Sequence, residues 1–251
     1  MARTIPALRA TRSRSVAEPT TVDVPLRRLL RWLAGFAERH GPWSARPGSP
    51  ADGRVPAWML SAQDGASAVL HAPAWLDAVV GSGPLPVAGD DPSDAAREDA
   101  RDSLVALAGL RPAYGVVLIR RAGYAVAWYH GDEVIERKVG TRHIHGRTAA
   151  GGWSQQRYAR RRGNQADEIA SATAVAAARI LGAARTPRDP VPAFLVTGGD
   201  RALLAATRAE LPAEVAALPA PVHLAVGTID SGVLAGVPDR VLAVRIDLAP
   251  S

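Results

Sequence analysis

Two glycines and two glutamines that directly precede a run of arginines are the residues of this chain best suited to chemistry. Residues 151–165 have the sequence GGWSQQRYARRRGNQ. Paired glycines such as Gly151 and Gly152 adopt backbone conformations closed to other residues and let the chain approach a partner closely. A glutamine such as Gln155 or Gln156 is an uncharged donor and acceptor, so it can orient a water molecule or a developing oxyanion beside backbone N–H groups. The stretch therefore predicts a loop that presents a water molecule to a reacting group.

The charge around this loop predicts a polyanionic partner. No aspartate or glutamate occurs between Arg137 and Ala166, whereas a solvated surface normally mixes both signs of charge. Arginines can hold RNA phosphates, and a tryptophan can stack on an unpaired base. The candidate RNA-binding residues are Arg142, Arg147, Trp153, Arg157, Arg160, Arg161 and Arg162.

The overall composition suits an RNA-associated cytoplasmic protein. The chain has 251 residues, a formal net charge of +6 and no cysteine. Without cysteine, disulfides and thiolate metal sites are excluded. Residues 1–22 are basic but lack the apolar core of a secretory signal, and no run of about 18 apolar residues predicts a membrane span. We therefore expect a disordered basic tail over 1–22 and no membrane partner, while the composition leaves the oligomeric state open.

Hydrophobic patterns divide the rest of the chain into two predicted regions, an N-terminal α+β region over 23–110 and a catalytic domain over 111–251. In the first region, Asp23 is the predicted cap of a helix that ends near Gly41, and the composition of 42–54 predicts a loop. A hairpin and a further helix follow; they are expected to turn at Asp64-Gly65 and to span about 92–107, respectively.

The second region predicts an α/β fold with a ribonuclease-H-like mixed sheet. Three apolar segments separated by tight turns predict an antiparallel meander, and a long helix is expected from about Gln156 to Gly182. A strand, a helix capped by Asp200 and further strands at VHLAV and RVLAVRIDL follow. The predicted order of elements is β-β-β-α-β-α-β.

Such a sheet first suggests a two-metal nuclease, which needs several carboxylates converging on two cations. The predicted first strand, YGVVLIRRAGY, contains none. His143 and His145 form an H-x-H pair with no third metal ligand close in sequence. The glycines of VTGGD lack the spacing of a dinucleotide-binding motif, and a turn before a helix explains them. The sequence therefore predicts no metal and no cofactor.

The glycine-glutamine loop, placed after a three-stranded meander and before a long helix, resembles the catalytic loop of release-factor-like peptidyl-tRNA hydrolases. The resemblance covers about 114–248 and is strongest to the actinobacterial branch related to the Vms-type hydrolase of eukaryotic ribosome quality control. More distantly, the segment is similar to the Gly-Gly-Gln domain of eukaryotic and archaeal class-one release factors.

The resemblance implies that the loop enters the peptidyl transferase centre of the large ribosomal subunit and promotes hydrolysis of the peptidyl-tRNA ester, releasing nascent peptides from stalled or other ribosomes. Gly151 and Gly152 match the family's glycines, and Gln155 is the expected catalytic glutamine. Trp153 and Ser154 interrupt the Gly-Gly-Gln pattern, so Gln156 stays an alternative. Two other functions remain open: a non-catalytic ribosome- or RNA-binding protein and, with less support, a metal-dependent nuclease.

Overall fold

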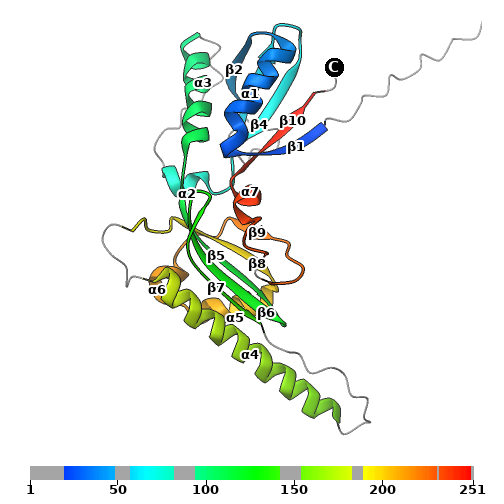
Figure 1. Cartoon of the computed structure of the whole chain (residues 1–251), viewed down its shortest axis with the longest axis vertical. Helices are drawn as coiled ribbons and strands as arrows, with labels where there is room; N and C mark the ends of the chain where they lie inside the picture. Colours follow the sequence, from blue (N-terminus) through cyan, green and yellow to red (C-terminus); the bar gives the residue numbers. More distant parts are fainter. Residues whose placement is uncertain are drawn as a thin grey trace, which may run out of the picture.

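The computed structural model describes residues 20–48, 57–81, 94–141, 154–182, 189–230 and 232–249. These residues form two five-stranded sheets in separate halves of the molecule, with helix α7 (Val237–Val241) at their junction (Figure 1). The sheet that contains the first strand is called sheet A, and the other is called sheet B. The mixed α/β fold class predicted from the sequence is confirmed.

Sheet A is antiparallel throughout and combines strands from both ends of the chain. Its order is β1-β10-β4-β3-β2, so the last strand lies between two strands of the N-terminal region. Helices α1 (Leu26–His40) and α3 (Asp94–Gly109) pack on each other and on this sheet. The strands are β1 (Thr20–Pro25), β2 (Trp43–Gly48), β3 (Ala57–Ala62), β4 (Ser67–His71) and β10 (Ala243–Leu248).

Three predictions for this half differ from the structure because strand pairing overrode the local pattern. Asp23 does not cap a helix; it lies in β1 opposite Arg245 of β10, and α1 begins after Pro25 without a side-chain cap. Residues 43–48 of the predicted loop form β2, which pairs with β3. Residues 20–22 of the predicted disordered tail also belong to β1. Residues 1–19 lie outside the described chain.

Sheet B has the order β7-β6-β5-β8-β9. The predicted meander is confirmed, with β5 (Ala113–Arg120), β6 (Gly123–His130) and β7 (Glu133–Thr141) antiparallel. Strand β8 (Phe194–Gly199) is parallel to β5, and β9 (Val222–Leu224) is parallel to β8. Strands β5 and β6 are buried along nearly their whole length, which explains their continuous apolar sequences. The ribonuclease-H-like assignment stays a prediction.

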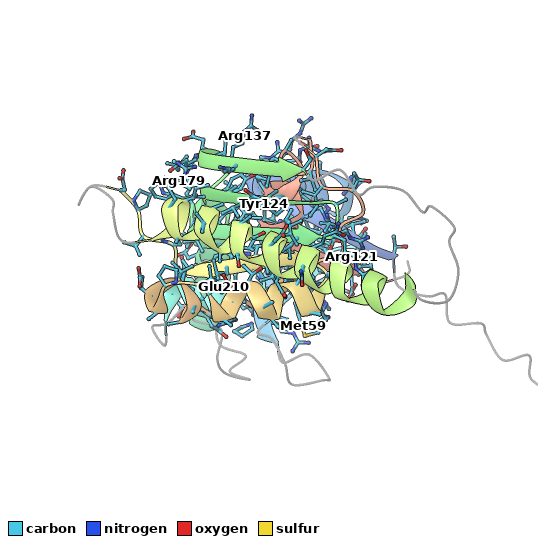
Figure 2. All side chains as sticks on the ribbon, turned by 90° about the horizontal axis from the view of Figure 1, so that it is seen from below. Met59, Arg121, Tyr124, Arg137, Arg179 and Glu210 are labelled. Carbon is cyan, nitrogen blue, oxygen red and sulfur yellow. The ribbon has the colours of Figure 1, made fainter. Side chains whose placement is uncertain are left out.

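Two helices lie side by side on one face of sheet B (Figure 2). They are α4 (Ser154–Leu181) and α5 (Arg201–Ala209), and both were predicted. Asp200 caps α5 as expected, since its Oδ1 accepts from the backbone N–H groups of Ala202 and Leu203 at 2.9 and 3.2 Å. The remaining helices are short: α2 (Leu76–Val80) and α6 (Ala213–Ala216).

A column of stacked aromatic rings joins the two halves. It consists of Trp75, Phe194, Tyr114 and Tyr129, with successive ring centroids 5.7, 5.3 and 5.1 Å apart. Trp75 Nε1 donates to the carbonyl of Val241 at 2.8 Å, which attaches the end of α7 to the column. The column therefore buries the ends of β5 and β8 at which those strands begin.

The two tyrosines of the column differ in their hydrogen bonding. The Tyr129 hydroxyl donates to the carbonyl of Leu234 at 2.7 Å, whereas the buried Tyr114 hydroxyl has no partner among the described residues. Burial raises the pKa of Tyr129 to about 12 and raises the pKa of Tyr114 further. Both groups are therefore held in their neutral form by their apolar surroundings.

Candidate active site

The predicted loop leaves sheet B at the end opposite the aromatic column. Thr141, the last residue of β7, is opposite Gly123 of the β5–β6 hairpin, and Ile119 of β5 is opposite Gly199 of β8. These pairings bring the ends of four strands together at the edge where the parallel strands β5 and β8 finish. We call this edge the loop-bearing end. In open α/β sheets, sites commonly form at this kind of edge.

Two glycines allow close packing at the loop-bearing end. Gly199 has φ +96°, and a Cβ on it would lie 2.1 Å from the carbonyl oxygen of Ile119. The chain turns there so that Asp200 N–H donates to the same oxygen at 2.9 Å. Gly140 lies against the Tyr124 ring, where a Cβ would come within 2.4 Å of a ring carbon. These contacts fix the sheet immediately before the loop begins.

Helix α4 returns from the loop along the sheet and is anchored by its C-terminal half. Ile169 and Ile180 are buried, and between them alanines such as Ala177 let the helix approach β6 closely. Arg179 of α4 also pairs with Glu136 of β7 at 2.5 Å. Ile169 is the first buried position of α4 among its described side chains. The N-terminal turns of α4 project past the end of the sheet (Figure 1).

The predicted site residues fall on the loop and on these projecting turns. Arg142, Arg147, Gly151, Gly152 and Trp153 lie outside the described residues. Gln155 and Gln156 are the second and third residues of α4, because the helix begins at Ser154 rather than near Gln156. The arginines of the helix follow within the same turns, and only their backbone is described: Arg157, Arg160, Arg161 and Arg162.

Three further arginines at the loop-bearing end were missed from the sequence. Arg120 and Arg121 lie in the β5–β6 hairpin, and Arg201 is the first residue of α5. All three are exposed, and none has an ion-pair partner within the described part of the chain. Figure 2 shows Arg121 at the end toward which the first turns of α4 point. The dipeptide Arg120-Arg121 beside a predicted hairpin turn is the sequence feature that could have indicated these residues.

The described residues contain neither a cluster of metal ligands nor a membrane-spanning helix. No three His, Cys, Asp or Glu side chains gather there into a possible metal site. The two glutamates of β7 form ion pairs: Glu136 binds Arg179, and Glu133 lies 3.3 Å from Arg111. Within the same residues, no helix combines the length and the apolar character required to cross a membrane.

The loop-bearing end therefore combines exposed arginines with a helix whose second and third residues are glutamines. The model of the actinobacterial and chloroflexi VLRF1 release factor family matches residues 112–247. The chain belongs to this family, as its loop motif suggested, and the family implies an interaction with the ribosome. No curated protein matches the chain.

The family match covers sheet B completely and sheet A in a single strand. It contains all strands of sheet B, the helices α4 and α5, and nearly all of β10. The neighbours of β10 in sheet A, which are β1 and β4, lie outside the match. The predicted division into an N-terminal region and a catalytic domain at 110/111 therefore separates β10 from the strands with which it pairs.

Proposed function

We propose that the protein is a cytoplasmic peptidyl-tRNA hydrolase that acts in the peptidyl transferase centre of the large ribosomal subunit. The observation that carries this proposal is the family match over a segment in which Gly151 and Gly152 precede α4, with one residue, Trp153, between them. Gln155 and Gln156 then occupy the first turn of that helix. This combination is what the family's loop requires: a backbone that can approach RNA closely, followed by a neutral amide.

The chemistry is the addition of water to the ester that joins the peptide to the terminal ribose of tRNA. Water attacks the carbonyl carbon, the bond from that carbon to the ribose oxygen breaks, and the ribose oxygen receives the proton. Gln155 orients the water or the developing oxyanion and is not the general base, because an amide does not titrate near neutral pH. Gln156 is the alternative for this role.

The length of α4 supports access to a confined site in RNA. From Ser154 to Ile169, its first buried position among the described side chains, the helix rises about 22 Å at 1.5 Å per residue. The glutamines lie in the first turn of this helix, and the following turns contain four arginines. Such a projecting basic helix suits insertion into a passage lined by phosphates.

The test is peptide release from purified ribosomes that carry labelled peptidyl-tRNA. Gln155→Ala should lose about 10²–10³ in rate while still sedimenting with ribosomes, because one positioned donor is removed and the arginines remain. Gly152→Ala should behave similarly, since a Cβ restricts the backbone where it approaches RNA. Gln165→Ala is the matched control, because Gln165 is an exposed glutamine of the same helix.

The outcome for the two glutamines decides the mechanism. Loss of release in Gln156→Ala alone would move the catalytic role by one residue. Release at the wild-type rate in both variants would defeat the hydrolase mechanism and favour the non-catalytic RNA-binding function, which the carboxylate-free run over 137–166 also supports.

Two additional measurements separate binding and metal dependence from release. Changing Arg160, Arg161 and Arg162 together to Ala should weaken ribosome association and flatten its salt dependence, because fewer counterions are released.

Peptide release should survive EDTA when polyamines maintain the ribosome. Activity that disappears on chelation and returns with magnesium in a ribosome-free assay would instead support the nuclease function.

A further inference from the structure

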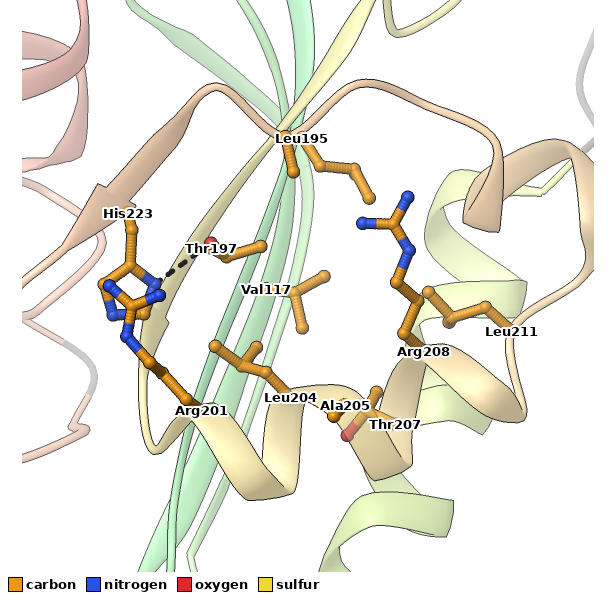
Figure 3. A pocket seen from close by; sticks show the side chains of 11 residues that line it. Val117, Leu195, Thr197, Arg201, Leu204, Ala205, Thr207, Arg208, Leu211 and His223 are labelled. Carbon is orange, nitrogen blue, oxygen red and sulfur yellow. Dashed lines mark hydrogen bonds between the residues drawn. The ribbon is translucent and has the colours of Figure 1, made fainter.

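A pocket of about 300 Å³ lies between α5 and sheet B, on the face that also carries α4 (Figure 3). Its floor is a row across three strands, because Val117 of β5 is opposite Thr197 of β8, and Thr197 is opposite His223 of β9. Leu195 lies two residues before Thr197 and faces the same side. The volume is at the lower end of the range for small-ligand sites and suits one compact ligand.

Helix α5 forms the opposite wall of the pocket with residues that share one face of the helix. Arg201, Leu204, Ala205 and Arg208 follow the spacing i, i+3, i+4 and i+7, so they share one face of the helix. The two arginines are about 10 Å apart along the axis, with the two apolar residues between them. Figure 3 shows them at opposite sides of the pocket, with Arg201 on the side of His223.

The polar groups of the pocket are arranged to receive an anion. Thr197 Oγ1 lies 3.3 Å from the carbonyl oxygen of Val222 and 3.2 Å from Nδ1 of His223, so the hydroxyl joins the two groups. Neither contact uses Nε2 of His223, which donates or accepts according to the tautomer of the ring. Arg208 is held by the carbonyl of Ala216 at 2.6 Å and keeps further N–H groups for a ligand.

Among the described residues, no carboxylate lines the pocket. The neighbouring Glu210 accepts from Ser171 of α4 at 2.9 Å. A flat apolar body with an anionic group on each side is the ligand that matches an apolar centre between two arginines. A nucleotide within an RNA strand has this form, since its base is flanked by a 5′ and a 3′ phosphate.

We propose that this pocket binds a single unpaired nucleotide of RNA. The base occupies the apolar centre formed by Val117, Leu195 and Leu204, while the flanking phosphates bind Arg201 and Arg208. Arg201 follows Gly199 and Asp200, so one side of the pocket lies at the loop-bearing end of sheet B. The inference rests on the proposed function for its choice of RNA, but the site is separate from the predicted catalytic loop.

The test is the binding of short single-stranded RNA and of free nucleoside 5′-monophosphates to the full chain, followed by fluorescence anisotropy and by calorimetry. Ala205→Leu fills the centre of the pocket and should weaken RNA binding at least about tenfold. Its control, Ala202→Leu, adds the same volume at an exposed position of α5 that does not line the pocket. Arg201→Ala should weaken binding and reduce the salt slope by about one. Arg39→Ala removes an exposed charge from α1 and controls for net charge.

Unchanged RNA binding in both pocket variants would overturn the proposal, as would preferential binding of an apolar peptide with a free carboxylate. Binding of free monophosphates that is as strong as binding of the oligomer would identify a mononucleotide site and overturn the assignment to an RNA strand. Gln155→Ala should bind the oligomer like the wild type. Because this assay does not measure peptide release, failure of the pocket and failure of the hydrolase mechanism are distinguishable.

Discussion

The two ends of sheet B differ in burial and in exposed charge. At one end, the first residues of β5 and β8 are buried in the aromatic column, whose outer ring is Trp75 at the start of α2. At the other end, the same strands finish among exposed arginines, a glycine with positive φ and the departure point of the predicted loop. One end contributes stability through burial, and the other leaves charge and backbone available to a partner. Changes of the buried side chains at the first end are therefore expected to alter folding, and changes of the exposed arginines at the second end to alter interaction with RNA.

The largest effect is expected from removing the N-terminal region. A fragment of residues 111–251 keeps β10 but lacks β1 and β4, which flank it, so the buried Val244 and Ile246 lose their neighbours. We expect no cooperative unfolding transition in thermal or urea denaturation. A fragment that starts at residue 20 keeps both neighbours of β10 and is the control. A cooperative transition of the 111–251 fragment at the temperature of the full chain would show that sheet B is independent of sheet A.

The next effect concerns the glycine at the end of β8. Gly199→Ala places a Cβ 2.1 Å from the Ile119 carbonyl oxygen at φ +96°. The backbone conformation alone costs about 1–3 kcal/mol, and the contact with the carbonyl adds to this cost. Gly227→Ala is the matched control, because a Cβ there meets nothing within 4 Å. Urea unfolding measures both variants, and equal midpoints would remove the structural role assigned to Gly199.

The stacked tyrosines should respond differently to loss of their hydroxyl groups. Tyr129→Phe leaves the Leu234 carbonyl without its donor and should lower the free energy of unfolding by about 1–3 kcal/mol. Tyr114→Phe removes a buried hydroxyl that has no hydrogen-bond partner among the described residues, so its stability should be unchanged or slightly higher. Both rings keep their stacking, which makes each variant the control for the other. Equal losses in the two variants would contradict this hydrogen-bond assignment.

The smallest effect is expected on the free energy of unfolding at alkaline pH. The pKa of Tyr129 is raised by burial from 10.0 to about 12, so folding favours its neutral form. This contribution is complete below pH 10 and is lost as the pH rises through about 12. The free energy of unfolding should therefore fall in this window, and the fall should be smaller in the Tyr114→Phe, Tyr129→Phe double variant. Urea titrations at pH 9, 10 and 11 measure the difference, and identical slopes for both proteins would contradict it.

Much of the candidate site could be predicted because its signals are local. The glycine-glutamine loop and the carboxylate-free run are properties of consecutive residues. The meander, α4 and the Asp200 cap follow from periodicity and turn chemistry within single segments. The Arg120-Arg121 hairpin was also within reach of the sequence. Its position beside the loop-bearing end, however, depends on the register of three strands.

The sequence by itself therefore determined the glycine-glutamine motif, the order of elements in sheet B and the family to which the chain belongs. Only the tertiary structure decided that β10 enters sheet A, that Asp23 lies in a strand, and that residues from β5, β8, β9 and α5 enclose one pocket. The physical reason is the range of the interactions. Helix caps, turns and periodicity act between near neighbours, whereas strand partners and ring stacking join segments far apart in the chain, and those partners are fixed by burial of the whole core.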